Sequence, residues 1–155
     1  MISLNVSTEP SNASIPTIRQ YPDSPDEQLA QHAKHNKFKN KAGQVLVDSP
    51  DVYFGMGENP LDATATRKLA GKVARAISHL EHAYLAIDLE YPRAFFEGLL
   101  LGGFDPRLYG AKEIEQTKLE VPSEHEKDMQ QAIEIADAAN RPRKIITTPG
   151  NHMYP

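Results

Sequence analysis

The feature that most constrains the fold is a short apolar run with a helix pattern on each side. Ala83–Ile87 is almost unbroken in apolar residues and is closed by Asp88, as is typical of a strand buried on both faces in the middle of a sheet. Before this run, residues 61–80 place apolar side chains at three- and four-residue spacing. After it, Pro92 opens a second helix that ends at Gly102-Gly103. This order predicts an α/β domain, a layered mixed sheet flanked by helices.

Other patterns predict further strands. Ile2–Val6 alternates apolar and polar residues, as a half-buried strand does. Val45–Val47 and Val52–Met56 are β-rich runs separated by turn-forming residues, which predicts a β-hairpin. Ile114–Val121 alternates imperfectly and is predicted as an edge strand. The proline-rich arm over about 9–25 is expected to hold neither a helix nor a central strand.

Local signals predict where three helices begin. A short helix is expected over Asp26–His35. After the hairpin, Asn59 is predicted as an N-cap, with Pro60 in the first helical position. Ser123 and Glu126 have the spacing of a capping box, which predicts the start of the last helix.

Length and composition fit one ordinary domain. Within the 155 residues we expect an α/β domain over 1–122, then a connecting helix to about Asn140 and a tail within 123–155. The absence of cysteine excludes disulfides and thiolate metal sites. The net charge of −4 argues against a nucleic-acid partner. No apolar run approaches the roughly 20 residues of a membrane span, and the N-terminus has no signal-peptide pattern, so a cytoplasmic location is expected.

Two motifs invite a ligand-binding interpretation. Gly55-Met56-Gly57 lies between a strand and a helix, where phosphates bind, but it lacks the third glycine of a dinucleotide fingerprint and the Gly-Lys-Ser/Thr of a nucleotide loop. His32/His35 and His79/His82 are spaced as two metal ligands on one helix could be. Neither pair has the carboxylate that a zinc-protease motif places directly after its first His, so surface histidines are the simpler interpretation.

The remaining charged groups do not form a site either. Several carboxylates are expected on an exposed strand edge and at a helix start: Glu113, Glu115, Glu120, Glu124 and Glu126. A basic cluster could contact an anion or lie in a solvated loop: Lys34, Lys37, Lys39 and Lys41. His125 and His152 add no ligand set. We therefore predict that the chain holds no catalytic, cofactor-binding or metal-binding residue.

Three stretches resemble the region that precedes the catalytic domain in leucyl aminopeptidases. They are Phe38–Val47 with Val52–Gly57, then Ala94–Asp105 with Tyr109, and lastly Ala132–Asn140 with Arg143–Pro155. The resemblance covers roughly residues 38–155, and the arm before it has no counterpart.

The resemblance implies a domain with a fold similar to macro domains. The family consists of cytoplasmic, typically hexameric enzymes that use two divalent ions, zinc or manganese, to remove N-terminal residues from peptides. Its metal ligands and catalytic Arg belong to a C-terminal domain, which would begin after Pro155. This chain would then be a non-catalytic domain that partners the catalytic one and contributes to assembly and active-site access. The alternative is a macro-like module that binds ADP-ribose or another nucleotide, with Gly55–Gly57 and Gly102-Gly103 as candidate phosphate loops.

Overall fold

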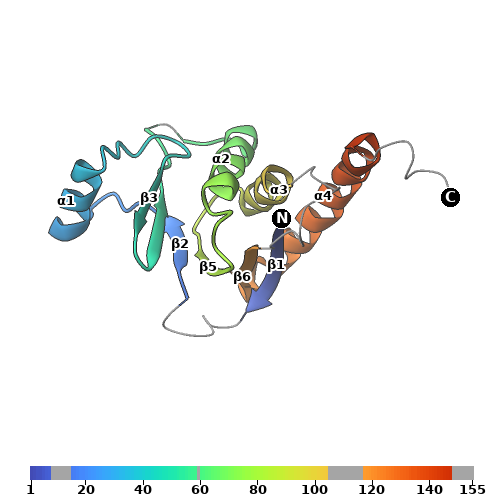
Figure 1. The fold of residues 1–155 in the computed structure, drawn as a ribbon, viewed down its shortest axis with the longest axis horizontal. Coiled ribbons are helices and arrows are strands. Elements are labelled where there is room, and N and C mark those ends of the chain that lie inside the picture. Colours follow the sequence, from blue (N-terminus) through green and yellow to red (C-terminus); the bar gives the residue numbers. More distant parts are fainter. Residues whose placement is uncertain (8–14, 59, 105–116, 148–155) are drawn as a thin grey trace.

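The described part of the chain forms one mixed sheet with helices packed against it (Figure 1). The computed structural model describes residues 1–7, 15–58, 60–104 and 117–147, with the last described side chain at Arg143. The strands are β1 (Ile2–Ser7), β2 (Thr17–Gln20), β3 (Val45–Asp48), β4 (Asp51–Phe54), β5 (His82–Ala86) and β6 (Thr117–Pro122). The helices are α1 (Glu27–His35), α2 (Ala63–Ala76), α3 (Pro92–Gly102) and α4 (Glu126–Thr147), with a 3₁₀ turn at Ser123–His125.

The six strands are ordered β1-β6-β5-β2-β4-β3. Neighbouring strands are parallel except in the predicted hairpin, where β3 and β4 are antiparallel. Strand β5 lies in the middle, between β2 and β6, as expected for the apolar run. The predicted fold class, an α/β mixed sheet flanked by helices, is confirmed.

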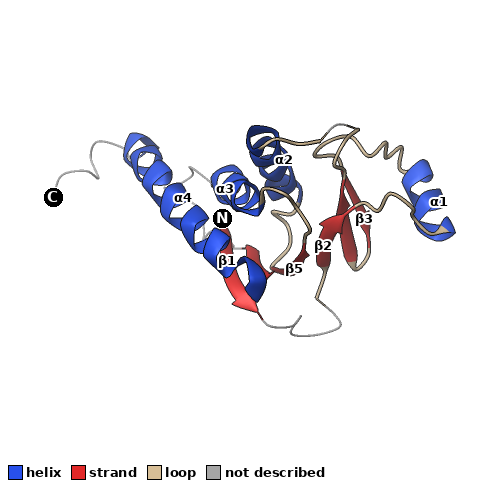
Figure 2. Ribbon diagram, turned by 180° about the vertical axis from the view of Figure 1, so that it is seen from behind, coloured by secondary structure: helices blue, strands red, loops and turns tan. Residues whose placement is uncertain are grey.

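The main core lies between one face of the sheet and the helices α2, α3 and α4 (Figures 1 and 2). The helices contribute Leu69, Val73, Phe95, Phe96, Leu99, Met129 and Ala132, and the strands contribute Leu4, Ile18, Val52, Phe54, Leu85, Leu119 and Val121. The rings of Phe54 and Phe95 stack with their centroids 5.3 Å apart. Helix α3 follows its sequence signals, with Pro92 at its start and Gly103 as its C-cap.

Helix α1 packs against the opposite face of the sheet, at its β3–β4 end. It begins where the sequence predicts, because the Asp26 side chain caps it by accepting a hydrogen bond from the Leu29 N–H at 2.8 Å. Its buried Leu29 and Ala33 meet Leu46 of β3 in a second apolar cluster, against which Tyr53 of β4 packs. Burial, aided by the nearby Asp51 carboxylate, raises the pKa of Tyr53 above its ordinary value. The sheet is therefore covered on this face at one end.

Strand β5 is fully buried on only one face, which corrects the expectation for the apolar run. Ala83 and Leu85 have no exposed surface and point into the main core. Their neighbours His82, Tyr84 and Ala86 point the other way and are half-buried. The physical reason is that α1 contacts the sheet at β3, away from β5.

The proline-rich arm contains a central strand, contrary to our expectation. Strand β2 lies between β4 and β5, and its Ile18 has no exposed surface. The prolines do not prevent this pairing because Pro16 and Pro22 lie just outside the strand, where no ladder N–H is lost. The Pro16 carbonyl even accepts a hydrogen bond from the Tyr84 N–H at 2.9 Å.

The predicted edge strand is in fact internal. Strand β6 pairs with β5 on one side and with β1 on the other, so β1 forms the edge. Its alternation is real, since Thr117, Leu119 and Val121 are all buried. The first residues of the predicted strand, 114–116, lie outside the described residues. The prediction of an edge was wrong because periodicity reports buried faces, not which strands lie alongside.

Two helices begin three residues later than predicted. Helix α2 starts at Ala63, capped by Asp62, whose carboxylate accepts from the Ala65 N–H at 2.6 Å. Pro60 therefore precedes the helix, and Asn59 lies outside the described residues. At the last helix, the 3₁₀ turn starting at Ser123 carries no side-chain cap and precedes α4. Helix α4 runs past Asn140 to Thr147. The proposed division at residue 122 stays a prediction.

Candidate functional site

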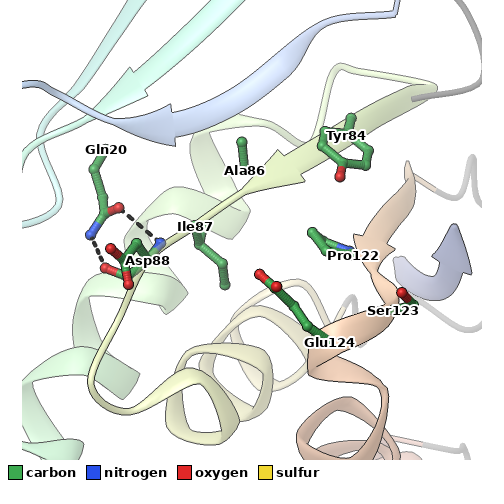
Figure 3. Close-up of a pocket in the computed structure, with 8 residues that line it drawn as sticks. All are labelled: Gln20, Tyr84, Ala86, Ile87, Asp88, Pro122, Ser123 and Glu124. Carbon is green, nitrogen blue, oxygen red and sulfur yellow. Dashed lines mark hydrogen bonds between the residues drawn. The ribbon is translucent and has the colours of Figure 1, made fainter. Parts of the chain in front are cut away.

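An open pocket lies where three parallel strands end (Figure 3). Its volume is about 480 Å³, and its lining comes from the carboxyl ends of β2, β5 and β6 and the segments that follow them. The lining residues are Gln20, Tyr84, Ala86, Ile87, Asp88, Pro122, Ser123 and Glu124. The carboxyl edge of a parallel sheet is where open α/β folds bind ligands. We therefore take this pocket as the candidate site.

The first wall of the pocket is fixed by the side chain of Gln20. Its Nε2 donates to the Asp88 carbonyl at 2.7 Å, and its Oε1 accepts from the Asp88 N–H at 3.0 Å. Both backbone groups of Asp88 are thus satisfied although β5 has already ended at Ala86. The two bonds hold the end of β2 beside the segment that follows β5 (Figure 3).

The second wall is formed by the start of the last helical segment. Pro122 ends β6, and the 3₁₀ turn then brings Ser123 and Glu124 to the pocket. His125 lies behind them, with its Nε2 3.4 Å from the Ile87 carbonyl and its ring centroid 6.0 Å from that of Phe96. The second wall is thereby attached to the segment after β5 and to α3.

The charges of the lining select against phosphates. Asp88 and Glu124 are the ionisable carboxylates of the lining, and both are exposed. The described lining contains no Lys or Arg. Nucleotides and ADP-ribose carry negative phosphates, which such a site repels. The pocket therefore has a position at the carboxyl edge of the sheet where a ligand could bind, but its charges do not suit a nucleotide, and we do not propose nucleotide binding.

The glycine turn over Gly55–Gly57 serves local packing. The Gly55 N–H donates to the Gln44 carbonyl at 2.8 Å, and the Gly57 N–H donates to the Asn40 carbonyl at 2.9 Å. A Cβ at Gly55 would collide with the backbone carbonyl of Lys41. Gly57 has φ of +84°, a conformation that glycine adopts readily. Because these N–H groups already have partners, the turn is not organised as a phosphate loop.

The pair Gly102-Gly103 is likewise unsuited to phosphate. It lies at the C-terminal end of α3, where the helix dipole is negative. The Gly103 N–H donates to the Leu99 carbonyl at 2.8 Å. A Cβ at Gly102 would approach the Gly71 Cα of α2 to 2.5 Å. This pair therefore terminates α3 and permits close helix packing.

The two histidine pairs are not arranged as metal sites. His32 contacts the Val47 carbonyl through Nε2 at 2.9 Å, whereas His35 is exposed. His79 is exposed in the turn after α2, and His82 begins β5. Within the described ranges, no group of three or more His, Asp or Glu residues could hold a metal ion. His152 lies outside those ranges.

A histidine–carboxylate contact that the sequence did not reveal joins two neighbouring strands. His82 Nε2 of β5 lies 2.9 Å from Glu120 Oε1 of β6, and the Glu120 side chain is only 13% exposed. The sequence had placed Glu120 on an exposed edge. Only the pairing of β5 with β6 brings the two residues together, and no local pattern encodes that pairing. Of the other predicted carboxylates, Glu113 and Glu115 lie outside the described residues.

None of the described helices is long and apolar enough to cross a membrane.

The fold, but not the sequence, matches known proteins. No protein-family model and no curated protein matches the sequence. The bottromycin maturation enzyme BotP in complex with Mn matches with a TM-score of 0.73 and 17% identity, over 92% of this chain and 34% of that one.

Two aminopeptidase structures also match. A mutant of tomato leucine aminopeptidase gives a TM-score of 0.70 at 16% identity, over 97% of this chain and 38% of that one. The cytosol aminopeptidase of Coxiella burnetii gives 0.53 at 18% identity, over 83% and 30% of the two chains. This chain thus spans about a third of the length of these proteins. At such identities the likeness shows the fold: the chain folds like one part of a leucine aminopeptidase or of BotP.

Proposed function

We propose that this chain is the non-catalytic, N-terminal domain of a leucyl-aminopeptidase-like metallopeptidase. The observation that carries the proposal is the extent of the structural match. Nearly the whole chain, 92% and 97% of it, superposes on about a third of BotP and of tomato leucine aminopeptidase. A match of this kind is expected when a chain corresponds to one domain of a larger protein. It agrees with the independent resemblance of the three sequence stretches.

The potential metal ligands of the chain support a separate catalytic domain. A two-metal peptidase needs several carboxylate or imidazole ligands converging on one place, and the described residues contain no such group. The two zinc or manganese ions of the proposed enzyme would therefore be held by a separate catalytic domain. In this proposal the chain contributes folding, assembly and access, and no chemical step of peptide hydrolysis involves its side chains.

The open face of the sheet supports a partner domain. Parallel sheets are usually covered on both faces, yet His82, Tyr84 and Ala86 of the central strand β5 are half-buried on the face away from α2 and α3. A catalytic domain of the same enzyme packed against this face would complete the cover. The pocket over Gln20 and Glu124 adjoins this face and would then lie at the boundary of the two domains. The cytoplasmic location and the hexameric assembly implied by the resemblance belong to the same proposal.

The proposal is tested by aminopeptidase assays with a leucine chromogenic substrate and added Mn²⁺ or Zn²⁺. The chain alone is compared with the longer chain that its gene is proposed to encode. We expect no turnover by the chain alone and metal-dependent turnover by the longer chain. Metal-dependent turnover by the chain alone would overturn the proposal, and substitution of His32, His35, His79 and His82 would then identify the ligands. An inactive longer chain that binds the metal would contradict the aminopeptidase assignment.

A further inference from the structure

A second concave surface lies on the outer side of the helical layer, between α2 and α3. It is an open groove of about 420 Å³. Helix α2 contributes Arg67, Lys68, Gly71, Lys72 and Arg75, and helix α3 contributes Gly98, Leu101 and Gly102. The charged residues of this lining are all cationic, whereas the chain as a whole has a net charge of −4. The groove is thus a positively charged surface on a protein with a net negative charge.

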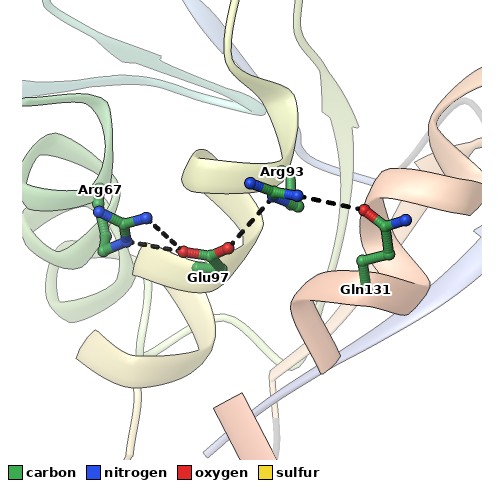
Figure 4. Close-up of polar contacts among 4 residues, drawn as sticks. All are labelled: Arg67, Arg93, Glu97 and Gln131. Carbon is green, nitrogen blue, oxygen red and sulfur yellow. Dashed lines mark hydrogen bonds and ion pairs between the residues drawn. The ribbon is translucent and has the colours of Figure 1, made fainter. Parts of the chain in front are cut away.

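Two of the four cationic side chains of the groove contact other groups of the chain, and the other two face solvent. Arg67 pairs with the buried Glu97 at 2.6 Å (Figure 4). Lys72 donates through Nζ to the Ala42 carbonyl at 3.3 Å, a bond that does not neutralise its charge. Lys68 and Arg75 are exposed and form no ion pair with any described residue. With the charge of Arg67 offset by Glu97, the groove retains the charge of Lys68, Lys72 and Arg75.

Three glycines lie in the lining of the groove, where α2 meets α3. Gly98 of α3 lies so close to α2 that an added Cβ would collide with the Arg67 carbonyl, and one at Gly102 would reach the Gly71 Cα. These glycines therefore let α2 and α3 pack closely, which brings the basic side chains of α2 beside α3. Leu101 adds an apolar contact beside them.

We propose that this groove binds an acidic peptide segment, with carboxylates on the basic residues of α2 and an apolar side chain against Leu101. Lys68 and Arg75 are seven positions apart on a helix, which corresponds to about 10 Å. An extended peptide covers that distance with roughly three residues, and its alternate side chains point the same way. The Arg75 guanidinium can donate two hydrogen bonds to one carboxylate, and Lys68 and Lys72 add charge.

The groove is less suited to nucleic acid. Its lining contains no aromatic side chain on which a base could stack. The overall negative charge of the chain also opposes a long polyanion, which extends beyond the groove. A short acidic peptide avoids that repulsion, so an oligonucleotide serves as the competing probe.

The test uses fluorescence anisotropy with a labelled peptide of alternating Glu and Leu residues. Lys68→Glu combined with Arg75→Glu should weaken binding about tenfold or more, because two charge-assisted contacts become repulsive. The matched control is Lys34→Glu with Lys127→Glu, which changes the net charge equally at exposed lysines of α1 and α4 that do not line the groove. We expect the control to bind within about twofold of the unaltered chain, since salt screens charges that do not contact the peptide.

Chemical-shift mapping on the unaltered chain places the peptide independently of any variant. Shifts confined to Arg67–Arg75 and Gly98–Gly102 support the groove. Absence of peptide binding would contradict the proposal, as would shifts elsewhere or equal weakening in the two variants. Tighter binding of a labelled oligothymidylate than of the peptide would replace it with a nucleic-acid surface. Aminopeptidase activity has no part in these measurements, so they are independent of the proposed function.

Discussion

At the scale of single residues, Glu97 is the polar side chain that ties the helical layer together. It is 4% exposed, and its Oε2 accepts from Arg67 Nε at 2.7 Å. Its Oε1 lies 3.4 Å from Arg93 Nε, and Arg93 in turn reaches Gln131 of α4 at 3.4 Å. The network therefore spans α2, α3 and α4 (Figure 4). A carboxylate buried this deeply is stable only with such partners.

Replacing Glu97 should destabilise the fold. We expect Glu97→Ala to lower the free energy of unfolding by about 2 kcal/mol, below the cost of breaking a fully buried pair because the released Arg67 can reach solvent. Arg93→Ala is the control, with an expected loss below about 1 kcal/mol, since its side chain is 54% exposed. Urea unfolding followed by circular dichroism measures both. Equal small losses would show that the network does not hold the helices.

Ile18 tests whether the proline-rich arm truly enters the sheet. Its side chain has no exposed surface, so Ile18→Ala should cost about 2–5 kcal/mol of unfolding free energy. Val47→Ala on the edge strand β3, where the side chain is 51% exposed, should cost less than about 0.5 kcal/mol. The same urea experiment compares them. If both variants match the unaltered chain, β2 is not a core strand.

At the scale of elements, the packing of α2 against α3 depends on glycine at specific positions. Gly98→Ala should destabilise the chain, because the new Cβ meets the backbone carbonyl of Arg67, which cannot move without shifting α2. Gly71→Ala is the matched control, since its Cβ would lie in ordinary van der Waals contact, 3.6 Å from the Gly98 carbonyl oxygen. Alanine favours a helix interior by about 1 kcal/mol over glycine, so this variant should be neutral or more stable. The thermal unfolding midpoints of the two variants test this prediction. A lower midpoint for Gly71→Ala than for Gly98→Ala would contradict it.

The sequence predicts those elements whose signals are local. Helix α3 has its proline at the start and its glycine at the end, and the hairpin has its turn residues between two β-rich runs. Strand β2 was missed because four residues between prolines are too short for a periodic pattern. Strand β6 was found, but its internal position depends on its pairing with β1, where Leu4 lies opposite Leu119, 115 positions later in the chain.

The candidate pocket could not be predicted for the same reason. Gln20 and Asp88 are 68 positions apart and meet only because β2 inserts beside β5. Glu124 was expected at a helix start, and it does lie there, but its position across from Asp88 follows from strand order. Residue types alone do not specify strand order, which is set by the packing of the whole sheet.

At the scale of the whole molecule, two surfaces on opposite sides of the α/β core are candidates for binding partners. The sheet has a half-covered face at β5, and the opposite helical layer carries the basic groove. In the proposed enzyme the first of these would meet the catalytic domain, and the second would stay free for an acidic peptide. Because the two surfaces lie on opposite sides of the sheet, variants in one should leave the function of the other intact.

The most direct test of the central proposal is reconstitution. The proposed catalytic domain is produced separately, loaded with Mn²⁺, and assayed on a leucine chromogenic substrate with and without this chain. We predict that the chain alone is inactive and that adding it raises kcat/KM of the catalytic domain in a saturable way. A catalytic domain that is equally active without the chain and does not bind it would contradict the account.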